Sequence, residues 1–340
     1  MKFFVMAFAI AGALFVSSGS AEESSLFLLE RKIPLGEVRG RIDHLAVDLK
    51  RGRLFVAELE NDMVAVVDLD TQNVIRITTG LSKPQGLGYH VPTDTLYVAN
   101  GGNGTLAMFS GDGYRPIASI PVGNDADNVR VDEISNQIFV AYGDGTSGEG
   151  ALGVVDPVGR TKIADIALKA HPESFQIHRG SKRIFLNDPT NSSIALVDLA
   201  ARRQVGTWPT QNGGNFPMAL NNAAEHVVVA FRAPAKLGAF SMKDGTSVAN
   251  VELCGDADDM FMDSKRQRIY VSCGEGFIDI FDVRGGTYGR IGRIASVAGA
   301  RTSLFVPELD LLFLAARATA SEPAAIWVFR PNAAADNDVP

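Results

Sequence analysis

The chain is poor in the residues that build small covalent frameworks and metal clusters. Two Cys and two Trp among 340 residues exclude a disulfide-stapled miniprotein and a multi-cysteine zinc or iron–sulfur framework. The chain also lacks His-x-x-x-His, Cys-x-x-Cys-His and Gly-x-Ser-x-Gly motifs. A compact zinc site, covalently attached haem and a nucleophilic serine elbow therefore have no support, and the catalytic residues, if any, are unknown.

Clustered positive charge is missing as well. The formal net charge is −7, and no run of basic residues is longer than a pair such as Lys50-Arg51. Because a duplex-binding surface needs clustered Lys and Arg to displace phosphate counterions, we expect no nucleic-acid partner. With 46% hydrophobic and 21% charged residues, the chain is also too apolar to be disordered.

The first residues have the pattern of a secretory signal peptide. Met1-Lys2 precedes an apolar stretch at 3–16, and small residues at 17–21 supply a cleavage site after Ala21. The stretch is shorter than the roughly 20 residues of a membrane-spanning helix; an uncleaved anchor is the alternative. We therefore expect a signal peptide at 1–21, a short leader at 22–28, and a periplasmic or secreted mature protein without stable membrane insertion.

One four-residue apolar pattern, here called the tetrad, recurs seven times at intervals of 42 to 46 residues. The tetrads are 54–57, 96–99, 138–141, 184–187, 227–230, 269–272 and 312–315. Each lies between two other short runs rich in β-branched and aromatic residues, and a fourth run completes the unit. Seven units of four antiparallel strands predict an all-β, seven-bladed β-propeller.

The predicted ring closes through its N-terminal segment. The seventh unit has no fourth strand after 326–329, whereas 29–36 matches the fourth-strand pattern at 117–123. We therefore expect the N-terminal strand to complete blade seven, in a single propeller domain at 29–331. A flexible C-terminal tail is expected at 332–340, and the protein is expected to be a monomer.

The tetrad Leu96-Tyr97-Val98-Ala99, followed by Asn100, resembles the YVTN-repeat β-propeller family of exported bacterial proteins. The resemblance extends over about residues 29 to 331. It implies the propeller architecture but no single activity, because related rings include ligand binders, partner-binding platforms, lactonases and redox subunits.

Propeller connectivity predicts where a ligand would bind. Loops that lead into the first strand of each blade gather on one face, and their polar residues should converge at the channel mouth. The predicted ligand-binding residues are Asp43, His44, Gln85, Asp127, Asn128, Glu173, Asp258, Asp259 and Arg301. Carboxylate repulsion there favours a cation, a cationic ligand or the Arg301 guanidinium. The alternative is that these side chains bond backbone N–H groups or face a solvated funnel.

A divalent cation such as calcium is a possible cofactor, because calcium takes carboxylate and amide oxygens. Its predicted ligands are Asp43, Asp127, Asn128, Glu173 and Asp258. His44 and His171 map to the same face, whereas the other three His map to the opposite one. Cys254 and Cys273 are expected to form a disulfide there; two buried thiols are the alternative.

Three functions remain open. The first is a periplasmic, non-catalytic propeller that binds a small ligand or a periplasmic protein at the channel mouth. The second is a metal-dependent, lactonase-type hydrolase in which His44 or His171 carries a proton. The third is an accessory subunit of a periplasmic redox system.

Overall fold

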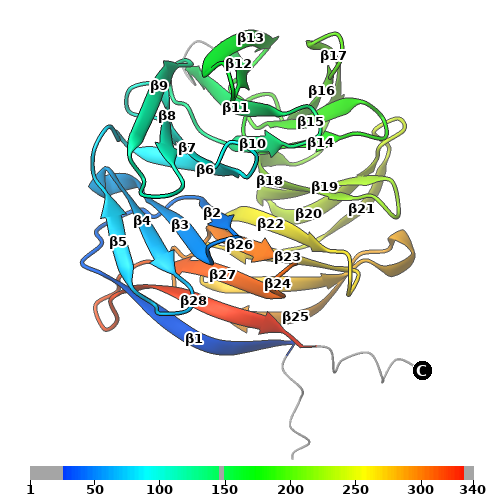
Figure 1. The fold of residues 1–340 in the computed structure, drawn as a ribbon. Helices are drawn as coiled ribbons and strands as arrows, with labels where there is room; N and C mark the ends of the chain where they lie inside the picture. Colours follow the sequence, from blue (N-terminus) through cyan, green and yellow to red (C-terminus); the bar gives the residue numbers. More distant parts are fainter. Residues whose placement is uncertain (1–25, 145–148, 333–340) are drawn as a thin grey trace, which may run out of the picture.

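The computed structural model describes residues 26–144 and 149–332. In these residues seven four-stranded antiparallel sheets form a ring, which confirms the predicted propeller (Figure 1). Two single-turn 3-10 segments, Leu59–Asn61 and Arg284–Gly286, interrupt the β structure. Across the described ranges no helix has the length and apolar character needed to cross a bilayer. The predicted signal peptide and most of the leader and C-terminal tail fall outside these ranges.

Each blade runs from an inner first strand to an outer fourth strand. The strands of blades 1 to 3 are β2 (Leu45–Asp48), β3 (Arg53–Glu58), β4 (Met63–Asp68) and β5 (Val74–Ile77); β6 (Pro84–His90), β7 (Thr95–Asn100), β8 (Thr105–Ser110) and β9 (Pro116–Pro121); β10 (Val129–Asp132), β11 (Gln137–Asp144), β12 (Glu149–Asp156) and β13 (Thr161–Leu168). Those of blades 4 and 5 are β14 (Phe175–His178), β15 (Arg183–Asp188), β16 (Ser193–Asp198) and β17 (Arg203–Pro209); β18 (Gly213–Asn221), β19 (His226–Ala233), β20 (Ala235–Ser241) and β21 (Ser247–Glu252).

Blade 6 contains β22 (Ala257–Asp263), β23 (Arg268–Cys273), β24 (Phe277–Asp282) and β25 (Gly289–Ala295). Blade 7 contains β26 (Ser303–Val306), β27 (Leu311–Ala316), β28 (Ala324–Pro331) and, as its outer strand, β1 (Phe27–Gly36). Every tetrad lies on the second strand of its blade and is buried. Alternate residues of these strands point to opposite sheet faces, so each blade packs on both neighbours.

The closing strand confirms the prediction and corrects its boundary. β1 pairs antiparallel with β28, from Phe27 opposite Pro331 to Gly36 opposite Ala324. It begins two residues before the predicted position 29, because the Phe27 ring is buried with its centroid 4.7 Å from that of Tyr270 in blade 6. The strand thus joins the two ends of the ring and also contacts the preceding blade.

The Asp residues that end several third strands form turns. Asp68 Oδ1 accepts hydrogen bonds from the backbone N–H groups of Asp70 and Thr71, at 3.0 and 2.7 Å. Asp198 does the same with Ala200 and Ala201. Such side-chain bonds replace a backbone turn bond, so these carboxylates lie at structural turns away from the channel mouth.

Candidate functional site

The loops before the first strands and after the second strands gather at one end of the ring and enclose a polar cavity of about 200 Å³, here called the funnel. It is lined by Arg41, His44, Gln85, Asp125, Asp127, Asn128, His171, Glu173, Ser174, Phe216, Arg232, Asp258 and Arg301. Asp43 and Asp259 are the two predicted residues outside this lining. A carboxylate oxygen of each lies within 4 Å of a His44 ring nitrogen. The structure therefore brings all the predicted residues together.

A second cavity, of about 370 Å³, continues along the axis of the ring and is lined by the first strand of every blade. His44 and Ser174 line both cavities, so they mark the boundary between the funnel and the central channel.

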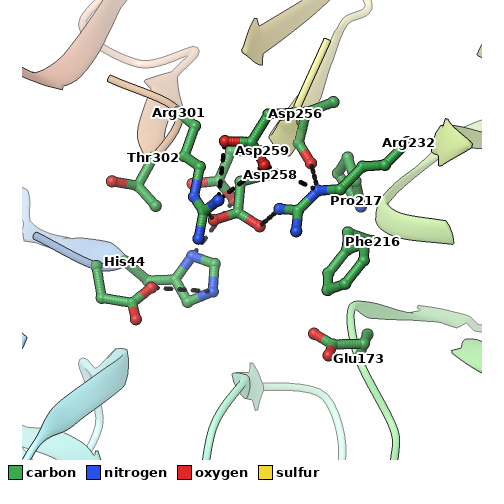
Figure 2. A network of polar contacts seen from close by, with 12 residues as sticks. His44, Glu173, Phe216, Pro217, Arg232, Asp256, Asp258, Asp259, Arg301 and Thr302 are labelled. Carbon is green, nitrogen blue, oxygen red and sulfur yellow. Dashed lines mark hydrogen bonds and ion pairs between the residues drawn. The ribbon is translucent and has the colours of Figure 1, made fainter. Parts of the chain in front are cut away.

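His44 lies at this boundary among three carboxylates, of which Figure 2 labels Asp259. Its Nδ1 is 3.4 Å from Asp259 Oδ1, and its Nε2 is 3.8 and 3.9 Å from Asp43 Oδ1 and Asp127 Oδ1. Burial alone would lower the pKa of His44, but the charges of Asp259, Asp43 and Asp127 outweigh it and raise the pKa to about 10. His44 is therefore a cation at neutral pH.

Two arginines neutralise the acidic residues of blade 6 (Figure 2). Arg232 Nη2 is 2.5 Å from Asp258 Oδ1, and Arg301 Nε is 2.8 Å from Asp258 Oδ2. Asp256 contacts both guanidinium groups, at 3.3 and 2.8 Å. The Arg232 guanidinium also lies 3.6 Å from the centroid of the Phe216 ring. The shared carboxylates orient both arginines, and the cation–π contact adds to this for Arg232.

The acidic residues of blades 3 and 4 have a different environment. Backbone N–H groups of Asp127 and Glu173 bond the carbonyls of Ala141 and Asn187, which fixes both residues at the start of their blades. Asp127 Oδ1 and Asn128 Oδ1 are buried, and neither accepts a hydrogen bond from the described residues. No Lys or Arg of blades 2, 3 or 4 belongs to the funnel lining given above.

Burial is the main cause of the raised pKa values of Asp127 and Glu173 in blades 3 and 4. Burial raises the pKa of Asp127 to about 7; the charge of Asp43 adds to the effect, and the His44 charge opposes it. Burial, together with the charges of Asp127 and Asp258, raises the pKa of Glu173 well above its usual value. His171 Nε2 lies 3.8 Å from Glu173 Oε1, while its Nδ1 bonds the carbonyl of Gly143.

Two of the five residues predicted to bind calcium already pair with arginine. Asp43 is paired with Arg41 at 2.8 Å, and Asp258 lies between two arginines. His44 Nε2 lies 3.8 Å from Asp43 and 3.9 Å from Asp127. In the described ranges no three His, Cys, Asp or Glu side chains are grouped as metal ligands.

Gln85, another predicted ligand-binding residue, has a partner within the funnel, because its amide donates a hydrogen bond to Asp125 Oδ1 at 2.9 Å.

The mouth also contains the disulfide between Cys254 and Cys273, whose Cα atoms are 5.9 Å apart. Both residues are fully buried, and the bond ties the loop before β22, which leads to Asp256 and Asp258, to the end of β23. Cys254 N–H also donates to Asp279 Oδ2 at 2.9 Å. The bond therefore fixes the backbone next to the blade 6 carboxylates.

The sequence analysis missed Arg41, Arg232, Asp125 and Asp256, all of which lie close to predicted positions. Arg41, Asp125 and Asp256 are two residues before the predicted Asp43, Asp127 and Asp258, and Arg232 is two residues after a tetrad. Because strand side chains repeat every second residue, this spacing was the available signal.

No family model matches the chain, and no curated protein matches it. Among solved structures it is similar to a chain of Kuenenia stuttgartiensis hydrazine synthase, with TM-score 0.72 and 17% identity over 82% of this chain and 96% of that chain. It is also similar to a chain of a mitotic checkpoint complex, with TM-score 0.74 and 13% identity over 97% of this chain and 99% of that chain. At such low identity these similarities show a shared fold alone, and the protein is a seven-bladed β-propeller.

Proposed function

We propose that this propeller is a non-catalytic binding protein that takes a protonated amine in its funnel. The observation that supports the proposal is the pair of carboxylates Asp127 and Glu173, which line the funnel. Among the described residues no arginine or lysine forms an ion pair with either, and the pKa of each stays raised although His44 lies 3.9 Å from Asp127. The raised pKa values mean that the nearby cations do not offset the cost of burying these two carboxylates, so they gain most from a ligand that brings further positive charge.

An ammonium group matches this side of the funnel in hydrogen bonding as well as in charge. It donates three hydrogen bonds, and the oxygens of Asp127, Asn128 and Glu173 offer three acceptors on adjacent blades. Blades 5 to 7 do not offer such an ammonium-binding site, because Arg232 and Arg301 already form ion pairs with Asp258. The amine is therefore expected to bind against blades 3 and 4.

The ammonium could belong to a free small molecule or to a lysine side chain of a partner protein, because both present the same group. Propellers serve as binding scaffolds in both settings. We also propose that the protein is exported and belongs with the YVTN-repeat propellers. The disulfide supports export, since such bonds persist in oxidising compartments.

The test is isothermal titration calorimetry at pH 8 with n-butylamine and with Nα-acetyl-lysine amide, which mimics a lysine side chain. The wild-type protein should bind at least one of them, and the double variant Asp127→Asn with Glu173→Gln should weaken binding at least tenfold, about 1.4 kcal/mol. The matched control is Asp112→Asn, an exposed carboxylate at the β8–β9 turn on the opposite face. Undetectable binding of both probes, or equal binding by the double variant, would refute the proposal.

A further inference from the structure

Arg232 and Arg317 occupy the same position in their blades, two residues after the tetrads of blades 5 and 7. Their surroundings within the blade also match. A Cβ added to Gly214 would lie 3.2 Å from the Arg232 side chain, and one added to Gly299 would lie 3.3 Å from that of Arg317. Both arginines therefore pass beside a glycine of their own blade, Gly214 in β18 and Gly299 in the loop before β26.

The next blade differs between the two cases. Arg232 contacts Asp256 and Asp258 at the start of blade 6. The corresponding positions at the start of blade 1 are Arg41 and Asp43. One of the two carboxylates is thus replaced by a guanidinium, and the other is already paired with that guanidinium at 2.8 Å.

Arg317 consequently lacks the ion pairs that Arg232 forms. Within residues 26–144 and 149–332 no carboxylate oxygen is recorded within 4 Å of it, and its buried Nε–H has no acceptor. The Nε–H of Arg41 is buried without an acceptor as well. Burial lowers the pKa of Arg317, and the nearby charges of Arg301 and Arg41 lower it further. The Arg317 side chain also passes Gly299, two residues before Arg301, so Arg301, Arg317 and Arg41 all belong to the segments that meet at the boundary between blades 7 and 1.

This boundary faces blades 3 and 4 across the ring, since half of a seven-blade ring separates them. Arg41 and Arg301 line the funnel at the boundary between blades 7 and 1, and Asp127 and Glu173 line it at blades 3 and 4. Figure 2 shows Arg301 and Glu173 on opposite sides of the His44 ring. One side of the funnel thus carries the paired guanidinium groups of Arg41 and Arg301, with Arg317 beside them and without an ion pair among the described residues. The other side carries two carboxylates without an arginine or lysine ion pair in the same part of the chain.

We propose that the ligand is a zwitterion, with its ammonium group on Asp127 and Glu173 and a carboxylate on the cluster of Arg41, Arg301 and Arg317. This inference rests on the proposed function and adds a carboxylate to the ammonium group proposed there. A carboxylate suits the site because two guanidinium groups can bind its two oxygens, and each charge-assisted hydrogen bond is stronger than a neutral one.

The test compares probes of equal length in calorimetry at pH 8. The zwitterions are ω-amino acids with three to six carbons, each measured beside the alkylamine and the alkyl carboxylate of the same chain length. The wild-type protein should bind one zwitterion at least tenfold more tightly than the matching amine. Arg317→Gln should reduce this ratio to about one. Arg115→Gln, which removes an exposed arginine on the opposite face, should preserve the ratio, and melting curves check that each variant folds.

The outcomes separate the two proposals. Amines that bind as tightly as the zwitterions at every length would overturn the zwitterion inference and leave the amine site intact. An unchanged ratio in folded Arg317→Gln would overturn it as well, because the anion would then bind elsewhere. If Arg317→Gln does not fold, Arg41→Gln provides the same comparison. Undetectable binding of amines and zwitterions alike would refute the amine site itself.

Discussion

Replacement of His44 by Gln is expected to destabilise the propeller by about 3 kcal/mol at pH 7. A His44 pKa that rises from 6.5 to about 10 on folding corresponds to about 4 kcal/mol of stability at that pH. A glutamine amide can keep one hydrogen bond to Asp259, worth about 1 kcal/mol. Because the folded-state pKa is raised, the contribution is complete below pH 6.5 and disappears as the pH rises through about 10.

Two measurements check this value. Urea unfolding at pH 7 gives the stability difference, with His178→Gln on the opposite face as the control. NMR of the His44 ring then reports its charge, which should stay that of an imidazolium from pH 5 to pH 9. A ring that titrates with a midpoint below pH 8, or a variant as stable as wild type, would refute the electrostatic argument.

Three further predictions follow from other parts of the molecule. Cys254→Ala should lower the free energy of unfolding by about 3 kcal/mol, the entropy expected for a loop of this size, and urea melts under oxidising conditions would reveal it; an equal loss from reduction of the wild-type protein is the control. Phe27→Ala should cost about 3 to 5 kcal/mol because the buried ring closes the propeller, whereas Leu28→Ala, at an exposed position on the same strand, should cost under about 1 kcal/mol; similar melting temperatures would contradict this. Alkylamine affinity should rise between pH 6 and pH 8, because Asp127 must lose its proton, with a pKa of about 7, before it can pair with the ligand; calorimetry in two buffers of different ionisation enthalpy should show proton release, and a pH-independent affinity would count against Asp127 as the partner.

The repeat made the architecture predictable. Tetrads at regular intervals located the second strand of every blade, and the unmatched segment 29–36 identified the closing strand. The start of β1 was missed because the burial of Phe27 depends on Tyr270, which is distant in sequence. Local patterns report which residues can form a strand, but such a tertiary contact decides where this strand begins.

The site was predictable in position but only partly in chemistry. The repeat register placed Asp127, Glu173 and Asp258 at the mouth, yet it could not distinguish their environments. Asp258 is neutralised by Arg232, which comes from blade 5, and by Arg301 from blade 7. Pairing across blade boundaries depends on side-chain direction, which sequence spacing does not report.

The irregularities of the ring explain why a ligand would bind on one side. Seven identical carboxylates at the mouth would repel one another, and each blade would have the same need for a cation. Arginines at positions 232 and 301 satisfy that need for blade 6, and Arg41 does so for Asp43. In the described part of the chain no arginine or lysine forms an ion pair with Asp127 or Glu173, so the negative charge that lacks such a pair lies in blades 3 and 4. A ligand that supplies positive charge gains there and nowhere else in the funnel, and this difference fixes its orientation.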